Sequence, residues 1–112
     1  MAALDLSGSP GPVKTARASL EASAANAREV KLPKWCRKFT CIFKTSANAD
    51  DAGKFAGAGT DAAAIGTDVF PVPSGSALEL QIAQIAIGTR SVFISGDAGG
   101  GYAYILLEAK AQ

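Results

Sequence analysis

The chain has no histidine among its 112 residues, and this absence excludes many catalytic schemes. Nucleophiles activated by histidine, such as Ser–His and Cys–His pairs, cannot be built, and neither can a zinc site with a histidine ligand. The two cysteines are too few to close a structural zinc site by themselves. We therefore expect no catalytic residue, no metal and no cofactor, and we predict that the protein is not an enzyme.

The two cysteines, Cys36 and Cys41, are predicted to lie on one extended strand. Five residues of such a strand place their Cα atoms about 16 Å apart, whereas a disulfide needs about 4.4–6.8 Å. The spacing favours two free thiols in a reducing compartment, because cytosolic disulfides are rare. A bridge from either cysteine to another subunit stays open.

Long apolar runs are also missing. No stretch of 18 apolar residues is present, so we expect no membrane-spanning segment. The N-terminus does not show a charged region followed by a continuous apolar one, which a secretory signal would require. The expected product is made in the cytoplasm and has no membrane partner.

The stretch from 67 to 108 has the pattern of four short strands, predicted at 68–72, 77–83, 90–95 and 102–108. Apolar residues alternate with polar ones between turns rich in Gly, Pro, Asp and Ser, which is typical of antiparallel strands. Turns at this spacing favour a sandwich or a small barrel. The segment 46–66 between the earlier strands and this stretch is predicted as a long loop of small residues.

Few bulky apolar residues precede Arg28, so the chain is divided into an extended N-terminal arm, 1–27, and a β-sandwich domain, 28–112. Within the arm, Ala16 to Ala27 has the composition of a short helix, with Thr15 as its N-cap. We expect a neighbouring subunit to hold the arm in place. The predicted fold is therefore an all-β, antiparallel β-sandwich of six to eight short strands with this arm.

The longest predicted strand runs from Trp35 to Thr45. Phe39, Cys41 and Phe43 share one face, which we expect in the core. The opposite face carries lysines, and Ile42 lies among them. Because lysine is rarely buried without a partner, this face should be exposed.

Charge is segregated along the chain. Residues 28–44 carry six basic side chains against one acidic side chain, a net of +5, and residues 45–112 carry three basic against seven acidic, a net of −4. Such a bipolar molecule can pair head to tail with its own copies or bind an acidic surface. The basic stretch also resembles a nucleic-acid surface, but its two phenylalanines are expected in the core. A strand edge protected by lysine is the favoured interpretation, and nucleic acid is not favoured as a partner.

Two loops resemble ligand motifs only in part. Residues 96–101 are rich in glycine, but a strand follows instead of the helix that a phosphate site requires, so a hairpin loop is predicted. Residues 48–53 match a calcium loop weakly, because Ala52 and Gly59 stand where two ligands are needed. Neither loop supports a cofactor.

Both faces of the last strand are apolar, with Tyr102, Tyr104 and Leu106 on one side and Ala103, Ile105 and Leu107 on the other. A single sandwich covers one side of each sheet, so the second side is predicted to contact another subunit. A different class of function, a module that binds carbohydrate or a surface ligand through Trp35, Tyr102 and Tyr104, stays open.

Taken in order, these patterns resemble small β-sandwich structural proteins of tailed-bacteriophage virions. The matching segments are Leu32-Pro33 followed by Trp35, RKFTCIFKT at 37–45, VFPVPSG at 69–75, SVFISGDAGG at 91–100 and YILLEA at 104–109. The basic stretch 28–44 departs from the mostly neutral character of such proteins, which leaves the contact surface open.

The resemblance implies a non-enzymatic virion component that decorates or cements the capsid, or else a subunit of the neck or tail. It implies a homo-oligomer whose partners are virion proteins such as the major capsid protein. The residues expected at its interfaces are Leu4, Leu6, Leu20, Lys34, Trp35, Arg37, Tyr102 and Tyr104.

Overall fold

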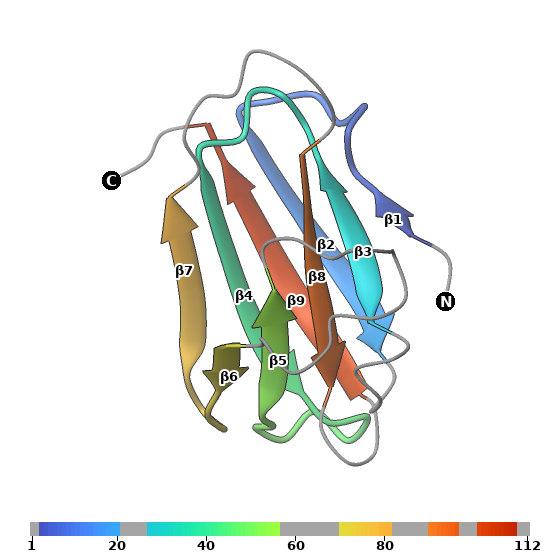
Figure 1. Ribbon diagram of the computed structural model, residues 1–112, viewed down its shortest axis with the longest axis vertical. Coiled ribbons are helices and arrows are strands. Elements are labelled where there is room, and N and C mark those ends of the chain that lie inside the picture. The colour runs from blue at the N-terminus through green and yellow to red at the C-terminus, as the bar shows by residue number, and fades with distance from the viewer. Residues whose placement is uncertain (1–2, 21–26, 57–69, 82–89, 97–100, 110–112) are drawn as a thin grey trace.

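The computed structural model describes residues 3–20, 27–56, 70–81, 90–96 and 101–109, and within these ranges the chain forms nine β-strands and no helix. The strands are β1 (Leu4–Asp5), β2 (Val13–Leu20), β3 (Arg28–Leu32), β4 (Lys38–Lys44), β5 (Gly53–Ala56), β6 (Phe70–Val72), β7 (Ala77–Gln81), β8 (Arg90–Gly96) and β9 (Gly101–Glu108) (Figure 1). The all-β prediction is confirmed, with more strands than the six to eight expected.

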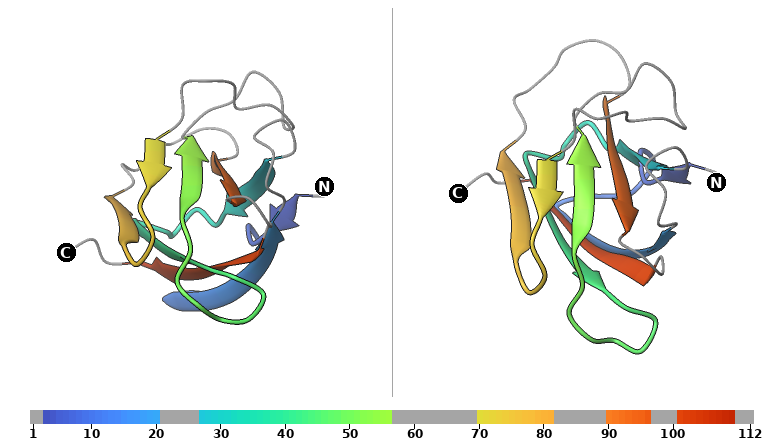
Figure 2. Two further views of the ribbon diagram at one scale, coloured as in Figure 1. Left: turned by 90° about the horizontal axis from the view of Figure 1, so that it is seen from below. Right: turned by 60° about the horizontal axis from the view of Figure 1, so that its bottom comes forward.

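The strands form two sheets that pack face to face as a sandwich (Figure 2). One sheet has the order β1-β3-β8-β5-β6 and the other the order β2-β9-β4-β7. All pairings are antiparallel except that of β1 with β3. The predicted sandwich is therefore confirmed.

The four strands predicted after Thr67 correspond to β6, β7, β8 and β9. Their observed ends agree closely with the alternating pattern, while residues 68–69 and 82–83 lie outside the described residues. Between β6 and β7, Gly75 adopts a φ of 81° and the amide of Ser76 donates to the carbonyl of Pro73 at 3.1 Å. This is the turn that Pro73-Ser74-Gly75 predicts, because glycine tolerates a positive φ.

Successive strands mostly belong to different sheets; of the nine, only β5 and β6 are consecutive neighbours in one sheet. The hairpin predicted at 96–101 is therefore wrong. β8 lies in the five-stranded sheet and β9 in the four-stranded sheet, so their connection passes from one layer to the other. A glycine-rich sequence predicts a turn, but it does not specify which strands pair on either side of it.

The inner face of β4 is the centre of the core. Phe39 and Cys41 are fully buried and Phe43 nearly so, whereas Ile42 on the opposite face is 36% exposed. The predicted orientation of this strand is thus confirmed. It follows from the period of two in a strand, which separates the aromatic residues from the lysines.

The first 27 residues differ from the expected arm. β2 pairs with β9 along its whole length, from Val13 with Glu108 to Leu20 with Gly101. Leu6, Ala18 and Leu20 are buried in the core cluster, so the boundary placed before Arg28 lies inside the sandwich. The helix predicted at 16–27 is also wrong where the structure describes it, because Ala16 to Leu20 is strand. Alanines at alternate positions hid this strand, because their small side chains give a weak apolar signal.

The predicted loop at 46–66 contains β5, and its remaining part from 57 onward lies outside the described residues. Phe55 on this strand is buried in the core. Gly53 packs so closely against the ring of Phe43 that a Cβ at position 53 would collide with it. Glycine here permits the close approach of the two sheets, and it is also the reason that the strand escaped prediction.

Candidate assembly interface

The outward side of the four-stranded sheet, which we call the open face, is formed by the side chains of every second residue of its strands. The backbone pairings place neighbours across the sheet in four rows. The rows, from β2 to β7, are Val13–Glu108–Lys38–Gln81, Thr15–Leu106–Thr40–Glu79, Arg17–Tyr104–Ile42–Ala77 and Ser19–Tyr102–Lys44.

The centre of the open face is apolar. Ile42, Tyr104 and Leu106 lie on the adjacent strands β4 and β9, and together with Thr15 and Thr40 they line an open depression of about 350 Å³. Each of these three apolar side chains retains partial exposure. The open face thus combines an apolar centre with backbone groups that are already paired within the sheet.

Charged side chains surround this centre. Arg17 lies over the ring of Tyr102, with its guanidinium carbon 4.5 Å from the ring centroid. The Lys44 ammonium contacts an Asp50 carboxylate oxygen at 2.6 Å. An apolar centre with a polar rim is the usual composition of a protein–protein interface.

The five-stranded sheet differs from the open face, because side chains on both faces of its middle strand, β8, are buried. On β8, Val92 and Ile94 face the core, and Phe93 and Ser95 on the alternate face are also buried. The Ser95 hydroxyl has no hydrogen-bond partner among the described residues. Phe70 on the edge strand β6 is 61% exposed but stands at the margin of that sheet.

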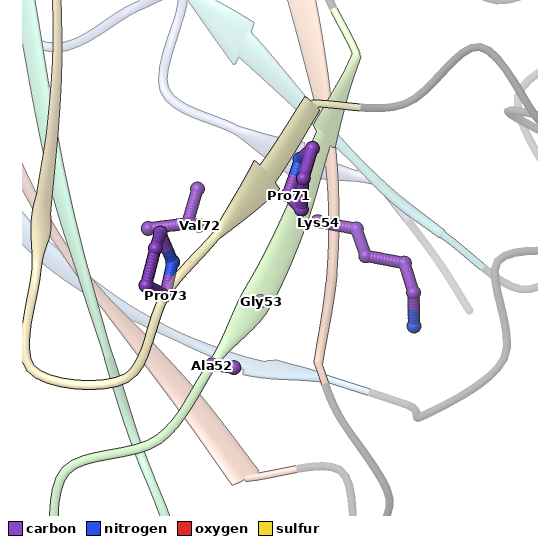
Figure 3. A pocket seen from close by; sticks show the side chains of 6 residues that line it. All are labelled: Ala52, Gly53, Lys54, Pro71, Val72 and Pro73. Atoms are coloured by element: carbon purple, nitrogen blue, oxygen red, sulfur yellow. The ribbon is translucent and has the colours of Figure 1, made fainter.

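A smaller depression of about 210 Å³ lies on the five-stranded sheet, between β5 and β6 (Figure 3). Pro71, Val72 and Pro73 line it. The Lys54 side chain extends away from Val72 and Pro73. Among the described residues that line it, Lys54 is the only one with a titratable side chain, so these residues supply no acid–base pair.

Three of the predicted interface residues lie near the N-terminus, and the structure does not place them on the open face. Leu6 and Leu20 are 6% exposed and belong to the core cluster, and Leu4 packs against that cluster from the edge strand β1. Two of the three are thus covered by their own chain. They were assigned to an interface because the segment was expected to lie outside the fold.

Three more predicted residues lie in or beside the connection between β3 and β4. The indole N–H of Trp35 donates to the carbonyl of Ser9 at 2.7 Å, and the ring packs against the core. Arg37 donates to the carbonyl of Lys34 at 2.8 Å, and Lys34 is exposed. Trp35 therefore ties the β1–β2 connection to the β3–β4 connection and does not project as a stacking surface.

Tyr102 and Tyr104 do lie on the open face, in neighbouring rows on strand β9. Trp35 is remote from Tyr102, because Trp35 precedes the start of β4 whereas Tyr102 pairs with Lys44 at its end. Six residues of strand separate Lys38 from Lys44, about 20 Å. The three aromatics therefore do not form one concave platform, which weighs against the carbohydrate-binding alternative.

Two residues beside Tyr104, Ile42 and Leu106, complete the apolar centre but were not among the predicted interface residues. Leu106 was expected on the same side of the last strand as the tyrosines, and Ile42 stands among lysines, so both signals were present in the sequence. The pairing of β4 with β9, which brings them together, was not predictable from either strand alone. The predicted basic edge is wrong as well, because β4 lies between β9 and β7 and β3 belongs to the other sheet.

Both cysteines are free and buried, so the two free thiols expected from the sequence are found. The strand predicted from Trp35 begins only at Lys38, so Cys36 lies before β4 and does not share a strand with Cys41. Burial raises the pKa of the Cys41 thiol to about 12. The thiol is therefore neutral at physiological pH and is not poised as a nucleophile or a metal ligand. Within the described ranges, no group of three His, Cys, Asp or Glu side chains is arranged to hold a metal ion.

No protein-family model matches the chain, and neither a curated protein nor a solved structure is significantly similar to it. In the part of the chain that the structure describes, no helix is long and apolar enough to cross a membrane.

Proposed function

We propose that the protein is a non-enzymatic structural subunit of a tailed-bacteriophage virion, which decorates or cements the capsid. One observation carries the proposal: β9 is apolar on both sides, and the second sheet of the sandwich covers only one of them. The opposite side, with Tyr104, Leu106 and neighbouring Ile42, is left to a neighbouring molecule.

The mechanism of such a subunit is burial of surface. Complete burial of one large apolar side chain contributes about 1.5–3 kcal/mol, and the apolar centre of the open face offers three that are now partly exposed. Each contact of this size is modest. Many copies held on one particle stabilise the assembled state by mass action. The proposed partners are other copies of this chain and virion proteins such as the major capsid protein, and the proposed location is the virion.

The sequence resemblance between Leu32 and Ala109 supports the choice of a virion over another assembly, and the sandwich fold is compatible with it. The same resemblance extends to neck and tail subunits. The open face is suited to either location, so position within the particle must be measured.

Immunogold electron microscopy tests the proposal directly. Antibody raised against the purified chain is applied to particles purified from the phage that encodes it, and mass spectrometry of the same particles checks for the chain. Label spread over the whole head supports capsid decoration. Label confined to the neck or tail assigns the chain there, and particles that lack the chain refute a virion role.

A further inference from the structure

We propose that the open face binds a second copy of this chain about a two-fold axis that runs parallel to the strands. The inference rests on the proposed function for its biological setting, and it names the first partner of the open face. Its physical basis is the arrangement of charges around the apolar centre.

Two face-to-face arrangements bring the apolar centres of two copies together. In the first, the two-fold axis runs along the strands between β9 and β4, so that β9 of one copy faces β4 of the other and β2 faces β7. In the second, the axis crosses the strands, so that each strand faces itself and the first row faces the last. The backbone register decides what meets in each arrangement.

The axis along the strands brings opposite charges together. Glu108 then faces the second copy's Lys38, and by symmetry Lys38 faces the second copy's Glu108. Tyr104 faces Ile42 of the other copy, which closes the apolar centre. The first row of the two copies becomes a cluster of four charges with alternating signs.

The axis across the strands gives no such attraction. Lys38 would face the second copy's Lys44, because these residues occupy the first and last rows of β4. Lys44 is already paired with Asp50, and Glu108 would face only Tyr102, so neither charge of the first row would gain an opposite charge from the second copy. Electrostatic complementarity therefore selects the axis along the strands.

The geometry of packed sheets is compatible with this choice. Two stacked sheets turn by about 30° relative to each other, which displaces the first row by about 5 Å from its ideal position. Lysine and glutamate side chains are long enough to span that displacement. Tyr104 and Ile42 lie nearer the centre of the open face, where the displacement is smaller.

The size of the open face predicts a weak dimer. Four strands about 4.8 Å apart and about 24 Å long give a planar area on the order of 460 Å² per copy. Two copies together fall at the low end of specific interfaces, where contacts are transient. We expect a dissociation constant on the order of 10 µM or weaker for the free protein.

Analytical ultracentrifugation of the full chain over a concentration series tests the inference. Wild type should show a reversible monomer–dimer equilibrium. Lys38→Glu and Glu108→Lys each convert both charge pairs into like pairs, so either change should weaken dimerisation by about tenfold or more. A mixture of the two variants should form heterodimers with about wild-type affinity, because both pairs are attractive again between unlike chains.

The mixture separates this contact from effects within one chain, since Lys38 and Glu108 are also cross-strand neighbours. Lys54→Glu supplies a matched control, because it makes the same charge reversal on the other sheet. That variant should dimerise as wild type does. Mixed with Glu108→Lys, it should form heterodimers more weakly than the first mixture does, because one of the two charge pairs stays repulsive, although the net charges equal those of the first mixture.

A second pair of variants tests the apolar centre without altering charge. Ile42→Thr should weaken dimerisation by about tenfold, and Phe70→Thr, which changes a more exposed apolar side chain on the other sheet, should leave it unchanged. Circular dichroism confirms that each variant remains folded.

Three results would overturn the inference: a wild-type monomer at every accessible concentration, a dimer indifferent to Lys38→Glu and Glu108→Lys, or a mixture that does not associate. A monomer that nevertheless labels virions leaves the proposed function standing and assigns the open face to another protein. A dimer absent from virions refutes the proposed function and leaves the two-fold contact intact.

Discussion

Cys41 shows how one buried residue links the core to pH. Its side chain is fully buried on the inner face of β4, and burial raises the pKa of its thiol from 9.0 to about 12. In the unfolded chain the thiol loses its proton near pH 9, whereas in the native protein it keeps the proton until about pH 12. The native state therefore binds more protons than the unfolded state between these values.

We predict that the free energy of unfolding decreases as pH rises from 9 toward 12 because of this thiol. Its contribution is fully present below pH 9, and its loss has a slope of up to about 1.4 kcal/mol per pH unit. Urea titrations at several pH values measure the slope. In Cys41→Ala the slope should be shallower, since other groups that titrate in this range remain. Equal slopes in the two proteins would show that Cys41 does not cause the loss.

At the scale of the element, β2 is the strand whose place in the fold differs most from the sequence prediction. It covers one edge of β9 with eight residue pairs and places Ala18 and Leu20 in the core. A segment with few bulky residues is therefore an integral part of the four-stranded sheet. Its loss would remove core side chains and uncover the edge of β9 together.

We predict that a truncation starting at Arg28 does not fold into the native sandwich. Loss of Leu6 and Leu20 alone removes about 1.5–3 kcal/mol for each, against a total stability of about 5–15 kcal/mol for a typical domain. Urea titration followed by far-UV circular dichroism measures this. A truncation starting at Leu4, which keeps every strand, should resemble the full chain. A cooperative transition at the wild-type midpoint for the shorter protein would mean that β2 is accessory.

The elements that the sequence predicted well share a physical feature. β4, β7, β8 and β9 alternate bulky apolar residues with polar ones or end at turn residues, so each strand can be read locally. β2 and β5 use alanine and glycine where a facing element approaches closely, as at Gly53 beside Phe43. The need for a small residue there depends on the other sheet, and local sequence does not carry that information.

The same distinction applies to the candidate interface. Tyr102 and Tyr104 were predicted because both faces of β9 are apolar, which one strand reveals. The open face itself depends on β4 pairing with β9, a contact between residues far apart in the chain. Leu6 and Leu20 were misplaced for the same reason, because the partner that covers them within the fold lies in distant sequence.

At the scale of the whole molecule, the chain passes from one sheet to the other at nearly every connection. The ladder of β2 with β9 joins the two ends of the sequence, since Val13 pairs with Glu108 and Leu20 with Gly101. Non-local pairing of this kind must overcome the entropy of closing long loops before it is stabilised. The four-stranded sheet cannot be completed until the last strand is present.

We therefore predict that refolding from denaturant is slow for a chain of this size, on the order of milliseconds to seconds, and that it occurs in one main phase. Trp35, the only tryptophan, is a convenient probe, because its indole bonds to Ser9 in the connection that leads into β2. Stopped-flow Trp35 fluorescence should thus follow the same time course as stopped-flow circular dichroism. A chain ending before Gly101 should show neither native signal, since β2 and β4 both lose their partner β9. Refolding within microseconds, or a Trp35 signal that develops well before the β-sheet signal, would show that the N-terminal segment docks without β9 and would contradict the coupling argued here.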